Sequence, residues 1–344
     1  MKNIMFFLIA SSMILAEGIS GLSYFRYTPS GSENRENHGF HIDRVYFTYK
    51  KDVSDKVSFK FQSDVQNKGD EAFYMYIKNA KMDYKVSDNT KLTIGLQGMN
   101  MFNIQEKTWG NRFLSKSAMD LNKWSASADL GLGVSQSFGS IFLSALYTNG
   151  EGYKKTASDI YEKLSVQAVY GEKRLDKKDG FNVGGVFSSL VYEVEDDLGT
   201  PDDETEEKKG TVMGIFAGFS GAGARLGFEY NMGTDLDLDY ADEGSGYGES
   251  SSLMSICANY NLPFDLPFSK SSTLFLRYDM LDAGVEDNTD TDLDESIADD
   301  KKTLLAGLIF KCIDGIEVSP NMTMITIGDA DPESSFNLTF QLKF

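Results

Sequence analysis

The stretch VSFKFQSDVQ, residues 57–66, alternates between apolar and polar side chains. Its apolar members are Val57, Phe59, Phe61 and Val65, and the residues between them are polar or charged. A period of two places successive side chains on opposite faces of a strand. The stretch therefore predicts a β-strand with one apolar face and one hydrated face.

The same alternation returns along most of the chain, whose 344 residues include 32 glycines, 24 phenylalanines and 17 tyrosines. Most alternating segments are about ten residues long, which is the length that a tilted strand needs to cross a bilayer. We therefore expect an all-β fold, a transmembrane antiparallel β-barrel of about 16 strands, although other divisions would give roughly fourteen or eighteen. The predicted strands span residues 18–28, 40–50, 57–67, 72–85, 91–98, 125–138, 140–149, 160–171, 180–194, 210–220, 223–232, 251–261, 272–281, 302–312, 315–328 and 334–344.

The predicted connections differ in length according to their order. Those after even-numbered strands are mostly short turns, and those after odd-numbered strands are mostly longer and more polar. This sorting is typical of outer-membrane barrels, which carry short turns at one end and long loops at the other. The alternative is a secreted β-sandwich with its apolar faces turned inward. Tyrosines near strand ends on the apolar faces favour the barrel, because they match an interfacial aromatic girdle.

The first 20 residues have the features of a secretory signal peptide. A basic start is followed by a short apolar run, residues 4–15, and then by small residues, so cleavage is expected after Ala16 or Ser20. The run is short for a membrane-spanning helix, and a buried helix or a first strand is the alternative. We therefore expect an exported protein whose barrel occupies residues 21–344, surrounded by the lipid of a bacterial outer membrane.

The chain ends with SSFNLTFQLKF, residues 334–344, in which apolar residues alternate from Phe336 to the terminal Phe344. We expect this strand to pair with the first strand and close the barrel, because a closed sheet leaves no edge exposed. Phe344 would then lie at the periplasmic membrane interface.

Three predicted long loops carry the whole net charge of −19. They are residues 195–209 with eight acids and two lysines, residues 233–250 with six acids, and residues 282–302 with nine acids and two lysines. An acidic channel mouth concentrates cations, so these loops predict a weak cation preference. The negative charge also argues against a nucleic-acid partner.

One of these loops contains a possible cation site. Asp290, Asp292 and Asp294 have the opening spacing of a calcium loop, but Glu295 stands where that loop needs glycine. A solvated acidic surface is therefore the main interpretation, with calcium or magnesium binding as the alternative. The two cysteines fall on opposite faces of their strands, Cys257 on a polar face and Cys312 on an apolar one, so no disulfide is expected.

The polar faces of the predicted strands would line the lumen with charges of both signs. Charged rings in a pore set its ion preference, and the alternative is that neighbouring charges merely neutralise one another. The predicted lumen-wall residues are Arg26, Arg44, Lys60, Asp64, Lys81, Asp83, Asp129, Lys163, Arg225, Glu229, Arg277, Asp279, Glu317 and Lys343.

The predicted third long loop, residues 99–124, is apolar for an exposed segment and contains both tryptophans of the chain. We expect it to fold toward the lumen, with its aromatic side chains on the wall and its bases facing the pore as a channel constriction. A cap on the rim or a subunit contact is the alternative. The predicted constriction residues are Lys107, Arg112, Lys116 and Lys123.

Several stretches resemble the phosphate-selective porins O and P. They are GFHIDRVYFTYKKDVSDKVSFKFQSDV (39–65), YIKNAKMDYKVSDNTKLTIGLQ (76–97), WGNRFLSKSAMD (109–120), SADLGLGVSQSFG (127–139) and YTNGEGY (147–153). In FLSKS, Lys116 takes the basic position at which relatives often carry arginine. The resemblance implies a sixteen-stranded, usually homotrimeric porin with its third loop narrowing the channel. It also implies that the outer-membrane assembly machinery recognises the aromatic end of the chain.

The resulting hypothesis is an outer-membrane porin for passive diffusion of small hydrophilic solutes or ions. The family members that select anions line their path with Arg and Lys, whereas this wall is mixed and these outer loops are acidic. The alternative function is a structural or binding protein whose acidic loops engage cations or polysaccharide. The only histidines are His38 and His41, and the sequence has no G-x-S-x-G, P-loop or zinc spacing. Neither an enzyme nor a cofactor is therefore expected.

Overall fold

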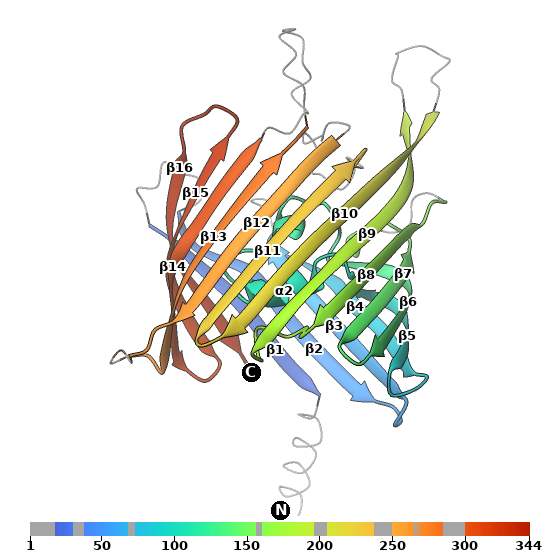
Figure 1. The fold of residues 1–344 in the computed structure, drawn as a ribbon. Coiled ribbons are helices and arrows are strands. Elements are labelled where there is room, and N and C mark those ends of the chain that lie inside the picture. Colours follow the sequence, from blue (N-terminus) through green and yellow to red (C-terminus); the bar gives the residue numbers. More distant parts are fainter. Residues whose placement is uncertain are drawn as a thin grey trace, which may run out of the picture.

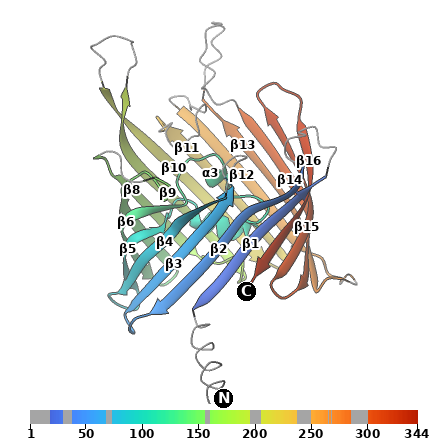
Figure 2. The same cartoon turned by 180° about the vertical axis from the view of Figure 1, so that it is seen from behind.

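The fold is a closed barrel of sixteen antiparallel strands, each paired with its neighbours in sequence (Figures 1 and 2). The computed structural model describes residues 18–29, 38–67, 73–155, 160–195, 205–236, 250–264, 266, 268–284 and 300–344. The strands are β1 (Ile19–Thr28), β2 (Gly39–Asp52), β3 (Val57–Asn67), β4 (Phe73–Lys85), β5 (Thr90–Gly98), β6 (Ala128–Phe138), β7 (Ile141–Thr148), β8 (Lys163–Gly171), β9 (Gly180–Glu195), β10 (Thr205–Gly221), β11 (Ala224–Thr234), β12 (Ser250–Asn261), β13 (Ser271–Asp282), β14 (Lys301–Ile313), β15 (Ile316–Ile327) and β16 (Glu333–Lys343). The predicted fold class is confirmed, and each predicted strand overlaps the strand of the same order.

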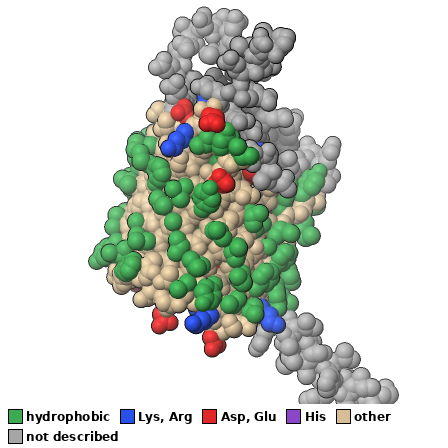
Figure 3. Space-filling model, turned by 90° about the vertical axis from the view of Figure 1, so that its right-hand side faces the viewer, with side chains coloured by type: hydrophobic (Ala, Val, Ile, Leu, Met, Phe, Trp, Pro, Cys, Tyr) green, Lys and Arg blue, Asp and Glu red, His purple; other side chains and the backbone are tan. Residues whose placement is uncertain are grey.

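Alternation along the strands turns apolar side chains outward and polar side chains inward. In β8, Leu164 and Val166 are exposed on the outer surface, whereas Ser165 and Gln167 are buried inside. Figure 3 shows hydrophobic side chains spread over the outer wall. Such a surface suits lipid, and the closed sheet satisfies the backbone hydrogen bonds of the strands without water. The described helices are all too short or too polar to cross a membrane.

The two ends of the barrel differ. We call the end with the short turns, where the C-terminus lies in Figure 1, the turn end, and the opposite end the loop end. One predicted loop boundary was wrong. Residues 205–209 belong to β10, because Glu207 and Lys208 pair with Glu193 and Tyr192 of β9. Residues 205–209 are all polar or charged, so they lack the apolar alternation that predicts a strand, and the sequence places them in the predicted loop 195–209.

The seam between β1 and β16 closes the barrel as predicted. The backbone N–H of Gly21 donates to the carbonyl of Phe344 at 3.1 Å, and the N–H of Phe344 donates to the carbonyl of Gly21 at 3.1 Å. A Cβ at Gly21 would come within 2.1 Å of the Phe344 ring, so only glycine admits this close approach. Phe344 is 81% exposed on the outside.

The structure bears on the predicted signal peptide only at its end, because residues 1–17 lie outside the described part. Ile19 and Ser20 belong to β1 and pair with Tyr49 and Thr48 of β2. Cleavage after Ala16 would therefore leave β1 whole, whereas cleavage after Ser20 would remove its first two residues. Both cysteines of the chain are free.

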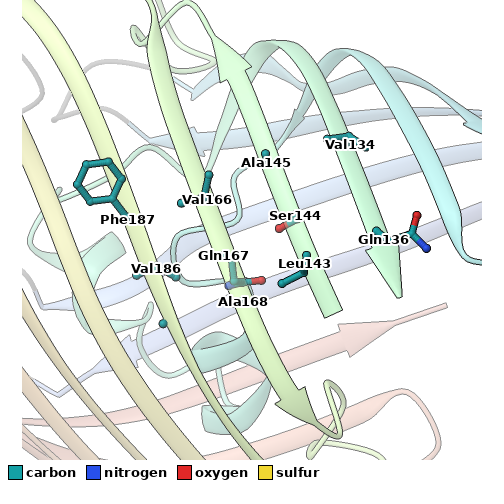
Figure 4. A pocket seen from close by; sticks show the side chains of 11 residues that line it. Val134, Gln136, Leu143, Ser144, Ala145, Val166, Gln167, Ala168, Val186 and Phe187 are labelled. Atoms are coloured by element: carbon teal, nitrogen blue, oxygen red, sulfur yellow. The ribbon is translucent and has the colours of Figure 1, made fainter. Parts of the chain in front are cut away.

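The outer wall has one apolar depression of about 490 Å³ across β6–β9, shown from close by in Figure 4. Its floor consists of the small residues Ala145, Ala168 and Gly185, and Val134, Leu143 and Phe187 stand around it. Two of the strands here are short, with eight residues in β7 and nine in β8.

Candidate functional site

The connection between β5 and β6, residues 99–127, folds into the barrel, and we call it the inner loop. It contains two short helices, α2 (Asn103–Trp109) and α3 (Ala118–Leu121). α2 contacts β10 and β11, α3 contacts β12, and Figure 1 shows α2 inside the barrel. The prediction that the third long loop folds toward the lumen is therefore confirmed.

One face of the inner loop is apolar and covers one side of the wall. Phe102, Met119 and Trp124 are buried in a cluster with inward-facing residues of β8–β13, among them Phe216 and Leu253. Full burial of a large apolar side chain contributes about 1.5–3 kcal/mol. Several such contacts hold the loop against this side of the barrel.

A second apolar cluster takes the tip of the inner loop to the barrel seam. Trp109 meets Phe275 of β13 edge to face, with ring centroids 6.0 Å apart. Phe113 lies 6.4 Å from Tyr24 of β1, which in turn meets Tyr46 of β2 at 6.1 Å. The loop therefore contacts the wall at β8–β14 and again at β1 and β2.

Two arginines fasten the inner loop through its backbone. Arg225 Nη2 donates to the carbonyl of Trp109 at 3.0 Å. Arg277 Nη1 donates to the carbonyl of Lys116, and its guanidinium forms a two-pronged ion pair with Asp279 at 2.6 and 2.9 Å. Both guanidinium groups therefore tie the inner loop to the barrel wall.

The predicted lumen-wall residues fall into several groups. Four of them lie beneath the inner loop, namely Arg225, Glu229, Arg277 and Asp279. Asp129 is 1% exposed, and its oxygens accept hydrogen bonds from the backbone N–H groups of Leu130, Gly150 and Gly152. Alternation predicts the face of each residue but not what covers that face.

Others lie near the ends of the barrel. Arg26 pairs with Asp43 at 3.3 Å toward the loop end. Lys343 pairs with Glu317 at 3.7 Å toward the turn end. Lys163 is buried at the loop end of β8.

The predicted constriction residues Lys107, Arg112, Lys116 and Lys123 all lie on the inner loop, in different settings. Arg112 is held between two carboxylates, in contact with Glu106 and 2.7 Å from Asp120. Its charge is therefore largely balanced within the loop. Lys123 has a left-handed backbone, with φ at 60°.

The two remaining constriction bases, Lys116 and Lys107, have lowered pKa values. Burial lowers the pKa of Lys116 to about 8, although Asp120, with its Oδ1 3.9 Å from the ammonium, opposes the shift. Burial also lowers the pKa of Lys107, and the nearby Arg174 adds to that effect. Both groups are therefore sensitive to the charges placed around them.

The wall formed by β2–β5 carries a polar cluster centred on Asp64. Asp64 is fully buried, contacts Arg44 and lies 3.7 Å from the ammonium of Lys78. The hydroxyl of Tyr153 donates to Asp64 at 2.8 Å, and the Lys78 ammonium lies 5.0 Å from the centre of the Tyr153 ring. Two cations thus share one carboxylate.

Sequence reasoning missed two members of this cluster. Lys78 is three positions from the inward-facing Lys81, so strict alternation would turn it outward. A β-bulge at this position of β4 leaves Lys78 without an opposite residue in β3 and turns it inward. Tyr153 belongs to the connection after β7, which reaches inward to side chains of β2–β4. In the sequence, only the aromatic side chain of Tyr153, at the end of YTNGEGY, indicates that contact.

A row of lysines crosses the same wall nearer the turn end. Lys50 stands directly opposite Lys60, and Lys60 stands directly opposite Lys81. Like charges in facing positions destabilise a sheet. Because the row lowers stability, it indicates a functional role for these lysines. Asp83 lies 3.0 Å from Lys81 and 3.5 Å from Lys91. This lysine row therefore has four ammonium groups and one carboxylate.

The turn between β8 and β9, residues 172–179, also folds inward and lies beneath the inner loop. Leu175 is 1% exposed. A Cβ at Gly218 would come within 2.7 Å of Leu175 and 2.8 Å of Thr108, so the bare glycine gives both side chains room. The turn therefore braces α2 from the turn end.

Comparison with solved structures identifies known barrels that share this fold. Pseudomonas putida OprB superposes with a TM-score of 0.64 at 12% identity over 97% of this chain and 96% of that one. Salmonella typhi OmpF in complex with daunomycin gives 0.61 at 11% identity over 95% and 97%.

The trimer form of Vibrio cholerae OmpT gives 0.61 at 12% identity over 95% and 98%. The chain has the sixteen-stranded porin fold. No protein-family description and no curated protein matches the sequence. The shared fold covers the whole barrel, and the narrower resemblance to phosphate-selective porins stays a prediction.

The acidic loops lie mostly outside the described residues. The predicted cation site of Asp290, Asp292 and Asp294 is there in full, so it remains a prediction, as does the alternative function of binding cations or polysaccharide. Among the described residues, no group of three His, Cys, Asp or Glu side chains could hold a metal ion.

Proposed function

We propose that this chain is a bacterial outer-membrane porin for passive diffusion of small hydrophilic solutes and ions. The observation that carries the proposal is the division of the barrel interior. The inner loop packs on β8–β14 and touches β1 and β2, and the β2–β5 wall opposite bears the charged side chains. Solutes would pass between that wall and the inner loop, and we call this route the passage. Catalysis is not part of the proposal.

We further propose that the passage prefers anions. The lysine row has three more positive than negative charges, and the Asp64 cluster adds one more. Electrostatic influence falls off over about 8 Å in physiological saline, so charges on the passage wall act more strongly on a passing ion than charges on distant loops. This preference is opposite to the one expected from the acidic loops, and it is compatible with the resemblance to phosphate-selective porins.

Planar-bilayer recording of the purified, folded protein tests both statements. We expect discrete single-channel steps in KCl and a reversal potential in a KCl gradient that favours chloride. A folded barrel without conductance would exclude the channel, whereas a reversal potential favouring potassium would exclude only the anion preference.

The anion preference should decline as the pH rises from 7 to 9. Lys116 has a pKa of about 8, so most of its positive charge is present below that value and is lost above it. The reversal potential of the wild-type channel is therefore expected to move toward zero across this range. In Lys116→Gln the same pH change should have a smaller effect, and an unchanged pH response in this variant would contradict the assignment.

We also propose that the barrels form a homotrimer. The small-residue depression over β6–β9 would let a neighbouring barrel approach closely, and β7 and β8, two of its strands, are short and offer little apolar height to lipid. The trimer form of the Vibrio cholerae protein supports this assembly. The particle mass in mild detergent distinguishes one barrel from three.

A further inference from the structure

A cavity of about 600 Å³ opens beneath the inner loop, on the far side of the barrel from the lysine row. Gly110 and Asn111 of the inner loop line it, together with the inward turn 172–179 and the turn-end portions of β11–β16. Its volume lies within the range of about 300–1,000 Å³ that is usual for ligand pockets. Its lining shares no residue with the lysine row or the Asp64 cluster.

The cavity is polar and has an excess of positive charge. Its lining includes five cations and three carboxylates, namely Lys177, Lys178, Arg225, Lys311, Lys343, Asp176, Asp179 and Glu317. Asp176 is already paired with Arg174 at 2.7 and 2.8 Å, and Glu317 with Lys343 at 3.7 Å. Lys178 and Lys311 have carboxylate partners outside the lining, Glu172 at 3.8 Å and Asp314 at 3.9 Å. Two cations, Lys177 and Arg225, therefore remain against one carboxylate, Asp179.

Arg225 is the cation with the least compensation. Among the described residues its guanidinium donates one hydrogen bond, from Nη2 to the carbonyl of Trp109 at 3.0 Å. Its Nε is buried and has no hydrogen-bond partner within the part of the chain that the structure describes. No described carboxylate lies within ion-pair distance of this guanidinium. A guanidinium is always charged and presents a planar fork of donors that matches a phosphate or carboxylate group.

The cavity also has neutral hydrogen-bonding groups in its lining, of which Thr273 Oγ1 donates to Asn261 Oδ1 at 2.8 Å. Asn261 of β12 and Ser271 and Thr273 of β13 line the same cavity. Amide and hydroxyl groups of this kind bind the hydroxyls of a solute, because each can both donate and accept hydrogen bonds. The site thus combines a fork for one anionic group with partners for several hydroxyls.

We propose that this cavity binds a hydroxylated anion, of which a sugar phosphate is the simplest example. The anionic group would lie against Arg225, and the hydroxyls against the Asn261, Ser271 and Thr273 side. In the outer-membrane porin proposed above, the short turns would face the periplasm, so the cavity would hold solute on the periplasmic side of the inner loop. Binding itself requires no conductance, so the site can be tested even if the channel proposal fails.

Calorimetric titration of the purified barrel in detergent with glucose 6-phosphate tests the site. Glucose 6-phosphate is expected to bind more tightly than either glucose or inorganic phosphate. Arg225→Gln should weaken binding by about tenfold or more, because hydrogen bonds to charged groups are stronger than neutral ones. Arg225→Lys, which keeps the charge, should retain part of the affinity and shows that a loss in the glutamine variant does not come from misfolding.

Lys60→Gln is the matched control, because it removes one cation from the passage and none from the cavity. We expect it to leave the affinity for glucose 6-phosphate unchanged. Equal weakening by Lys60→Gln, or no weakening by Arg225→Gln, would overturn the proposed site. Equal affinity for inorganic phosphate would overturn the assignment of a hydroxylated ligand.

Discussion

Replacing Lys60 and Lys81 together by glutamate is expected to reverse the ion preference of the channel from anions to cations. The two ammonium groups face each other across β3 and β4, and the double substitution changes the charge of the lysine row from +3 to −1. Fixed charge focused in a low-dielectric cleft changes local ion concentrations by about tenfold or more. The reversal potential in a KCl gradient should therefore change sign.

Lys51→Glu provides the matched control for this experiment. Lys51 is exposed and faces outward, opposite Phe59 of β3, next to a member of the lysine row. Lys51→Glu changes the charge by two units, as each of the two passage substitutions does, but it does so on the outer face, so the reversal potential should stay that of the wild type. The contrast between the variants should shrink at high salt, because screening shortens the reach of each charge. An unaltered sign in the double variant would show that ions do not pass this wall.

Deleting Phe344 is expected to cause a large loss of assembled barrel in the outer membrane. The deletion removes the two backbone hydrogen bonds to Gly21 and the aromatic ring packed on that glycine. Both contributions belong to the seam that joins β1 to β16. The amount of folded barrel, measured by its heat-modifiable mobility on gels, should fall sharply, while the conductance of the channels that do form should stay the same.

Two substitutions separate the seam from the terminal aromatic signal. Phe344→Ser keeps the backbone hydrogen bonds, so an equally severe loss in this variant would assign the effect to recognition of the aromatic end. Phe336→Ser removes another exposed aromatic side chain of β16, which is 62% exposed and distant from the seam contact with Gly21. We expect normal assembly from that control. Normal assembly after deletion of Phe344 would contradict both explanations.

The order and number of the strands could be predicted because alternation is strong wherever one face meets lipid. The prediction failed at residues 205–209, where β10 extends with charged residues and the apolar signal is absent. It also missed the inward position of Lys78, since a β-bulge changes the parity of a strand without changing its composition.

The site was harder to predict than the fold because it depends on contacts between distant segments. Arg225, Arg277 and Lys60 all lie on the polar faces of their strands. The path of the inner loop decides that the two arginines hold the loop, whereas Lys60 lies on the passage wall. The inward turn 172–179 is charged and looks like an ordinary surface turn, except for its single buried Leu175. Tertiary packing decided these roles.

The inner loop divides the circumference of the barrel into two parts with different tolerance to change. Arg277, Asp279 and the apolar clusters commit β8–β14 to holding the loop in place. At the lysine row, the β2–β5 wall does not hold the inner loop. The charges of this row can therefore be replaced while β8–β14 keep the loop, and with it the width of the passage, in place. Evolution or protein engineering could therefore change which solutes the channel admits through a few substitutions on four neighbouring strands.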